Sequence, residues 1–219
     1  MKSSIFHFPF SILRFWLFGL LIAGGLCWFF PPFHIVPLRQ SQQKQQQDVF
    51  DAAAFAGEFW QKKLLPATGR GVDIAELAAT LARDPATARQ RLGHSPGLSA
   101  TSYFFVKGSG LITVVDKESI RIRLDGPMAL PSVELFTGLL FGNTVRDATG
   151  FLNVSDFPNS QDFNSVSTEL NHIVEAQVVP GLRQRAAVGK AIRFAGCLEL
   201  EEGPVPKSLQ LIPVKVDWP

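Results

Sequence analysis

Polar side chains concentrate in one stretch of an otherwise apolar sequence, NTVRDATGFLNVSDFPNSQDFNSVSTELN, which runs from Asn143 to Asn171. Within it, Arg146 and Asp147 stand side by side between Val145 and Ala148. An arginine fork binds carboxylates, phosphates or neighbouring sugar hydroxyls, and the oxygens of Asp and Asn also suit sugar hydroxyls. The stretch is therefore the first candidate for a site that binds a small polar ligand.

Seven residues of this stretch form the candidate ligand site: Asn143, Thr144, Arg146, Asp147, Asp156, Asn159 and Gln161. If Arg146 and Asp147 lie in a strand, they point to opposite faces and do not pair with each other. One of them would then face a polar interior or a groove. The competing interpretation is structural: Arg146 is buried and satisfied by Asp156 or Asp162, which ties the loop to the sheet.

An enzymatic alternative uses the carboxylates of the same stretch. Asp147 with Asp156 or Asp162 would act as acid and base in a hydrolase of an envelope glycan, if the two carboxyl groups lie about 5 to 9 Å apart in an open cleft. The same oxygens would also allow calcium, although their spacing fits no EF-hand loop.

Other catalytic patterns point away from an enzyme. The sequence has no G-x-S-x-G elbow, no phosphate-binding G-x-x-x-x-G-K-[ST] loop and no H-E-x-x-H zinc motif. Cys197 with His172 would make a nucleophile and base, but the setting of Cys197 in AIRFAGCLEL is typical of a core thiol. We therefore predict no catalytic residue, no metal and no cofactor, and we favour a binding module over an enzyme.

Composition limits the class of partner. The chain has 219 residues, 46% of them hydrophobic, and a formal net charge of +2. These values are typical of one globular domain with an appendage, and they leave no broad basic footprint for nucleic acid.

The N-terminal segment predicts a membrane partner. Residues 15–38 contain no Lys, Arg, Asp or Glu, so residues 1–38 are expected to form an inner-membrane anchor or an uncleaved signal segment. Lys2 and Arg14 precede the segment, which favours a single-pass protein with its C-terminal domain in the periplasm. Lipid attachment at Cys27 is a further option, although Leu26 stands where a lipobox requires a small residue.

A polar tether, residues 39–47, leads to a single domain over residues 48–219. Helices are expected over 48–65, ended by Pro66, over 72–83, over 85–92 after the N-cap Asp84, and over 162–182. Trp60 neighbours the apolar stripe of the first helix and is interpreted as core rather than as a ligand platform. Strands are expected over 103–106, 110–115, 119–124, 132–140, 190–200 and 209–216. This order predicts an α+β fold with a mainly antiparallel sheet, which can close into a small barrel of the oligonucleotide- and oligosaccharide-binding (OB) type.

The polar stretch also resembles the hallmark segment of a bacterial family of predicted periplasmic lipoproteins, domain of unknown function 2291. The resemblance rests on a pattern near G-T-A-L-R-D-A, followed by spaced Phe residues, N-Q and a helix with L-N. The matching positions are Gly142, Thr144, Arg146, Asp147, Ala148, Phe151, Phe157, Asn159, Gln161, Leu170 and Asn171. Segments such as FFVKGSGLITVVD and VGKAIRFAGCLEL continue it, so that it covers nearly all of residues 49–216.

The resemblance implies a periplasmic protein of unknown function. Members often occur beside genes for sugar-type ABC importers, which implies a role near sugar uptake and components of an ABC transporter as partners. Two departures stand out: Asn143 replaces a usual Gly, and Leu139-Leu140-Phe141 replaces a usual Val-Ile-Arg. An Arg that would contribute to a ligand site is therefore missing at Phe141.

Overall fold

The computed structural model describes residues 50–97, 100–125 and 132–219 of the chain. The expected anchor (residues 1–38) and tether (residues 39–47) lie outside these residues. Among the residues described, no helix combines the length and the apolar character that crossing a membrane requires. The segment Phe50–Pro219 forms a compact unit of its own.

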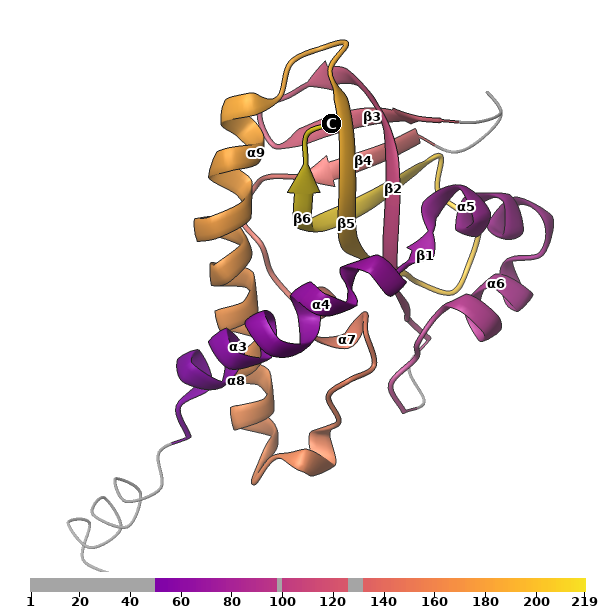
Figure 1. The fold of residues 1–219 in the computed structure, drawn as a ribbon. Helices are drawn as coiled ribbons and strands as arrows, with labels where there is room; N and C mark the ends of the chain where they lie inside the picture. Colours follow the sequence, from indigo (N-terminus) through magenta and orange to yellow (C-terminus); the bar gives the residue numbers. More distant parts are fainter. Residues whose placement is uncertain (1–49, 98–99, 126–131) are drawn as a thin grey trace, which may run out of the picture. The chain divides into compact units, whose positions relative to one another are not determined.

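Five strands close into a barrel. In chain order they are β2 (Ser102–Val115), β3 (Ser119–Leu124), β4 (Ser132–Phe136), β5 (Ala191–Leu200) and β6 (Ser208–Asp217). They pair in the order β2–β3–β4–β6–β5, and β5 pairs back with β2, which closes the ring (Figure 1). Every pair in the ring is antiparallel except β4 with β6. The predicted α+β class and the barrel closure are confirmed.

Strand β2 is longer than the sequence predicts, because the expected break at KGSG does not occur. The strand runs on through Gly108 and Gly110 and pairs with β5 from Ser102 to Leu111. A Cβ on Gly108 would lie 2.5 Å from Cγ2 of Ile74, and one on Gly110 would collide with the backbone of Arg123. The two glycines therefore permit close packing across the strand rather than a turn.

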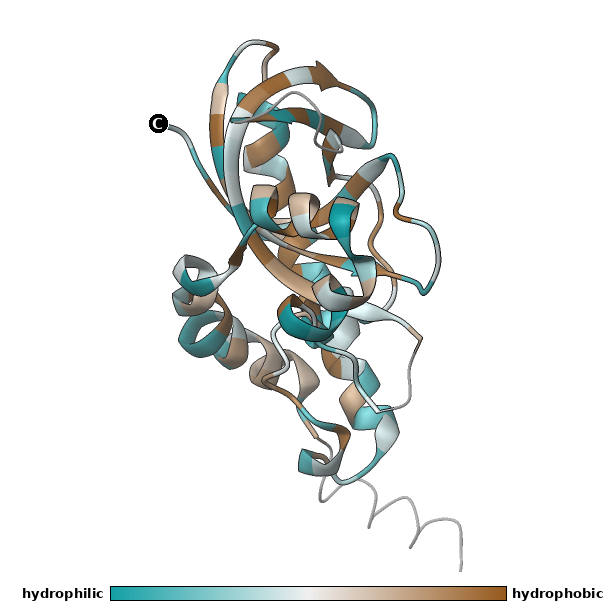
Figure 2. Cartoon of the chain, turned by 90° about the vertical axis from the view of Figure 1, so that its right-hand side faces the viewer, coloured by the Kyte–Doolittle hydropathy of each residue, from teal (hydrophilic) through white to brown (hydrophobic). Residues whose placement is uncertain are grey.

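Two helices close the barrel core at one end. Helix α5 (Ile74–Arg83) begins at Asp73, whose carboxylate accepts from the N–H groups of Ala75 and Glu76. Helix α6 (Pro85–Leu92) begins at Asp84, as predicted. Residues Val72–Asp73, expected to be helical, instead form β1, which pairs parallel with β2. In Figure 2, where α5 and α6 face the viewer, the barrel strands carry most of the brown.

A second core lies between the outside of the barrel and the remaining helices. Phe105, Cys197 and Val214 point outward from β2, β5 and β6 into this cluster. The helices pack over them, so these strands are buried on both faces. Figure 1 shows the long helical run of α8 (Ser160–Ile173) and α9 (Val179–Arg185) beside the barrel, crossed by α3 (Ala52–Phe59).

Both helical runs contain a π-helical segment followed by a proline. Segment η1 (Trp60–Leu64) links α3 to α4 (Leu65–Ala67), and segment η4 (Val174–Val178) links α8 to α9. The prediction that Pro66 ends the first helix is wrong. Pro66 lies in the first turn of α4, where a missing N–H is tolerated. Pro180 has the same place in α9. Single π-helical turns of this kind occur frequently at functional sites.

Candidate functional site

Arg146 and Asp147 lie in a one-turn helix, α7 (Thr144–Asp147), and not in a strand. Nε of Arg146 donates to Oδ1 of Asp147 at 2.7 Å, and Nη2 donates to Oδ2 at 3.0 Å. The expectation that these neighbours do not pair is therefore wrong. It assumed the alternation of a strand, whereas the helical turn lets the long Arg146 side chain fold onto the next carboxylate.

The rest of the Arg146 guanidinium is satisfied by α8. Nη1 donates to the carbonyl of Phe163 at 3.2 Å and to Oδ1 of Asn164 at 3.1 Å. The guanidinium carbon lies 3.6 Å from the centroid of the Phe163 ring. Both side chains of the ion pair are only 5% exposed. The arrangement fixes α7 against α8, as in the structural interpretation, but the carboxylate is that of Asp147 and not of Asp156 or Asp162.

The other predicted site residues have local partners. Thr144 donates to Oε2 of Glu199 at 2.6 Å. Asn143 occupies the N-cap position of α7 without a side-chain cap bond. Asp156 accepts from the N–H of Asn153 in a capping box, and Asn159 caps α8 by accepting from the N–H of Asp162.

Five of the seven predicted residues are therefore engaged by partners within the fold: Thr144, Arg146, Asp147, Asp156 and Asn159. Gln161 is exposed on the first turn of α8. None of the seven lines either of the two pockets described below. The polar stretch connects the elements of the fold through caps and one buried ion pair.

This geometry argues against the hydrolase alternative, which required two carboxylates in an open cleft. The Asp147 carboxylate is buried and held by Arg146, and Asp156 and Asp162 belong to cap structures. Among the described residues, no three His, Cys, Asp or Glu side chains gather as a metal site. Cys197 is fully buried, and burial raises the pKa of its thiol far above the ordinary value, whereas His172 is exposed on α8.

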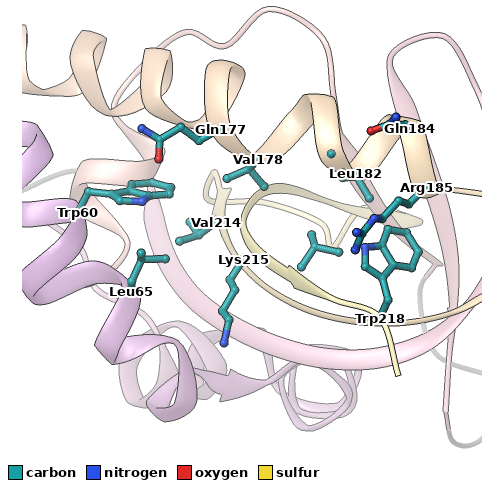
Figure 3. Close-up of a pocket in the computed structure, with 12 residues that line it drawn as sticks. Trp60, Leu65, Gln177, Val178, Leu182, Gln184, Arg185, Val214, Lys215 and Trp218 are labelled. Carbon is teal, nitrogen blue, oxygen red and sulfur yellow. The ribbon is translucent and has the colours of Figure 1, made fainter.

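An open pocket of about 400 Å³ lies elsewhere, between α9 and strand β6. Trp60 and Trp218 lie at its two ends, the Arg185 side chain lies beside Trp218, and the Lys215 side chain borders the pocket but extends away from the two indoles (Figure 3). Its remaining walls combine apolar side chains, two amides and one glycine: Leu65, Val178, Leu182, Val214, Val216, Gln177, Gln184 and Gly181. We call this space the tryptophan pocket. Its lining mixes apolar side chains with amides and cations, and its volume lies in the range of small-molecule sites.

Both π-helical segments contribute to the tryptophan pocket. Trp60 is the first residue of η1, and Gln177 and Val178 end η4. A π-helical turn rotates the residues after it relative to an α-helix, so these segments decide which side chains face the space. The two irregularities thus meet at one location, which is the expected pattern for a functional site.

Both tryptophans of the pocket also pack against the hydrophobic cores of the domain. Trp60 is 2% exposed and packs in the second core, so only its edge reaches the pocket. Trp218 packs against the barrel core, and Nζ of Lys190 lies 5.2 Å from its ring centroid. The same Nζ donates to the carbonyl of Arg185 at 3.0 Å. The interpretation of Trp60 as core is thus incomplete, since it is core and pocket wall together.

A second pocket, of about 320 Å³, lies on the outer face of β2, β5 and β6. Lys107, Arg193, Lys215 and Asp217 line it, so Lys215 borders both pockets. The strand register explains the grouping: Lys107 pairs with Ala195, and Ala195 pairs with Lys215. Residues far apart in the chain therefore share one face, which no local motif reveals.

The chain belongs to the family described as predicted periplasmic lipoprotein (DUF2291), because the family model matches residues 20–217. That membership describes a periplasmic lipoprotein of unknown function. Among solved structures, the chain is similar to an OB-fold protein from Thermotoga maritima MSB8. The two are 28% identical, the match covers 78% of this chain and 100% of that chain, and the TM-score is 0.71. No curated protein matches the chain.

Proposed function

We propose that the domain is a non-catalytic binding module whose ligand occupies the tryptophan pocket. The observation that carries the proposal is the pairing of Trp60 and Trp218 across one open space that both π-helical segments border. Trp218 is the more accessible indole, Trp60 adds an apolar edge, and the polar groups beside them fix the orientation of a bound molecule. The candidate carboxylates of the polar stretch have structural partners, which leaves binding as the activity that the geometry supports best.

The ligand class that fits is a small sugar-like molecule. A sugar ring has an apolar C–H face for Trp218 and hydroxyl edges for amides such as Gln177 and Gln184, which also line the pocket. The volume of about 400 Å³ suits one or two rings. The resemblance to a family found beside sugar-type ABC importers supports the same class, and we propose that the module assists such an uptake system from the periplasmic face of the inner membrane.

A thermal-shift screen of the full chain with mono- and disaccharides tests the proposal. A ligand at a hundred times its dissociation constant stabilises the folded state by ~2.7 kcal/mol, which raises the melting temperature by ~5 °C or more. We expect at least one such shift. A screen without any shift would contradict a sugar-binding role.

A substitution at Gly181 can fill the tryptophan pocket and so serve as a control for the screen. Gly181 lines the pocket, and a Cβ added there meets open space. Gly181→Met should therefore fill the pocket without disturbing the core and should abolish the ligand-induced shift. Gly57 in α3 also faces open space but lies outside the pocket, so Gly57→Met is the matched control and should keep the shift.

A further inference from the structure

The charges around the tryptophan pocket are of one sign. Its lining includes Arg185 and Lys215 and no Asp or Glu. This imbalance is local, because the whole chain has a formal net charge of only +2. A recess whose lining holds two cations and no carboxylate favours a ligand that brings its own negative charge, in competition with Asp217, which pairs with Lys215.

Arg185 is placed to bind an anion beside an indole. It is the last residue of α9, and its exposed side chain lies next to Trp218 in Figure 3. Its backbone carbonyl accepts from Lys190, whose ammonium lies at the Trp218 ring. The guanidinium therefore stands at the end of the pocket where a ring on Trp218 would direct an acidic substituent. A guanidinium fork recognises carboxylate and phosphate groups with two parallel hydrogen bonds.

Lys215 places a second cation at the border of the pocket, with its side chain extended away from the two indoles (Figure 3). Its ammonium lies 3.3 Å from the carboxylate of Asp217, and the two side chains are 48% and 57% exposed. An ion pair that is this exposed to water contributes little to stability. Lys215 can therefore leave Asp217 and bind the anionic group of a ligand. Lys215 also borders the second pocket, so the two spaces meet at this residue.

We infer that the ligand of the tryptophan pocket is an acidic sugar, one that carries a carboxylate or a phosphate. Its ring lies between Trp60 and Trp218, and its anionic group is bound by Arg185 and Lys215. This inference rests on the binding role proposed above. It adds a requirement that a neutral sugar does not meet, since a hydroxyl gains no charge-assisted hydrogen bond from either cation.

Matched pairs of neutral and acidic sugars test the inference by calorimetric titration of the full chain. Glucose, glucuronate and glucose 6-phosphate form one set, and galactose and galacturonate form a second. We expect at least one acidic member to bind at least about tenfold more tightly than its neutral parent, as charge-assisted hydrogen bonds to two cations imply. Comparison of glucuronate with glucose 6-phosphate separates a carboxylate from a phosphate. Added salt should weaken the acidic ligand and leave the neutral one unchanged.

Charge-removing variants locate the anion. Arg185→Gln and Lys215→Gln should each weaken the acidic sugar about tenfold and should weaken its neutral parent much less. Lys63→Gln removes an exposed cation of η1 that does not line the pocket, and it should change neither affinity. Circular dichroism and melting temperatures of the variants show whether each is folded.

The outcomes separate the two proposals. Equal affinity for acidic and neutral members, with no effect of Arg185→Gln or Lys215→Gln, would overturn the acidic ligand and leave the sugar-binding role standing. If acidic sugars bind but Gly181→Met does not block them, the tryptophan pocket is not their site, and both proposals fail. If no sugar of either kind binds, the sugar-binding role fails, and the acidic ligand with it.

Discussion

Asp147 receives both prongs of the guanidinium fork of Arg146, its immediate neighbour in the chain, at 2.7 and 3.0 Å. The pair is buried where α7 meets α8, and the Phe163 ring lies against the guanidinium. Arg146 and Asp147, which the sequence suggests as ligand-binding residues, thus form their hydrogen bonds with each other. Their role is to hold the helical layer together beside the barrel.

The ion pair should therefore contribute to stability and not to binding. Arg146→Ala or Asp147→Ala leaves one buried charge without its partner, so each change should lower the free energy of unfolding by about 3–5 kcal/mol. The double variant Arg146→Met with Asp147→Leu removes both charges and keeps volume, and it should lose much less. Urea unfolding followed by circular dichroism gives these values. Losses below about 1 kcal/mol in both single variants would contradict the structural role.

The charges of the same pair affect the pKa of Tyr103, the single tyrosine of the chain. Burial raises the pKa of its phenol above the ordinary value, and the negative charges of Glu199 and Asp147 add to that rise. Titration of the full chain at 295 nm, where phenolate absorbs, should give a midpoint above 10 in the folded state and near 10 in denaturant. Glu199→Gln should lower the folded midpoint, because it removes the larger of the two charge effects.

This shift has a consequence for stability at high pH. The folded pKa of Tyr103 lies above the unfolded one, so its contribution is complete below about pH 10 and is lost as the pH rises through the folded pKa. In Tyr103→Phe this part of the alkaline loss should disappear. An identical pH dependence in both proteins would contradict the assignment.

Cys197 should be inert to thiol reagents in the folded protein. It is 0% exposed in the second core, and burial raises the pKa of its thiol, so little reactive thiolate forms. In Cys27→Ser, where Cys197 is the remaining cysteine, reaction with a disulfide reagent should follow unfolding. Rapid labelling without denaturant would show that this part of the core opens readily.

Two glycines should respond in opposite directions to the same substitution. Gly181→Ala places a methyl group in open space on a helix and should stabilise the fold by about 0.5–1 kcal/mol. Gly110→Ala forces a Cβ against the backbone of Arg123 and should destabilise it. Chemical denaturation of the two variants measures both changes. A destabilised Gly181→Ala would mean that the pocket wall is more crowded than the structure shows.

The sequence predicts the fold well where local rules decide the structure. Asp84 before Pro85 marks a helix start, and alternation in Ser119–Leu124 marks a strand, and both are confirmed. The rules fail where tertiary packing overrides them. The glycines of KGSG read as a bend, but they serve close contacts inside one continuous strand. Pro66 reads as a helix end, but a preceding π-helical turn accommodates it.

The candidate site is harder to predict, for a physical reason. Polar residues adjacent in the sequence attract attention, yet adjacency in a helical turn let Arg146 and Asp147 satisfy each other. The tryptophan pocket joins residues from η1, η4, α9 and β6, which only the fold brings together. One signal was available: outside residues 15–38, the chain has only two tryptophans, Trp60 and Trp218.

Those two tryptophans allow the most direct measurement of the central claim. In a full chain carrying Trp16→Phe and Trp28→Phe, all indole fluorescence comes from Trp60 and Trp218. Titration with the sugar that gives the strongest thermal shift should change the emission in a saturable manner, with the dissociation constant found by calorimetry. The change should vanish in Gly181→Met and persist in Gly57→Met. Heat of binding without any change in emission would place the ligand elsewhere and contradict the tryptophan pocket as the binding site.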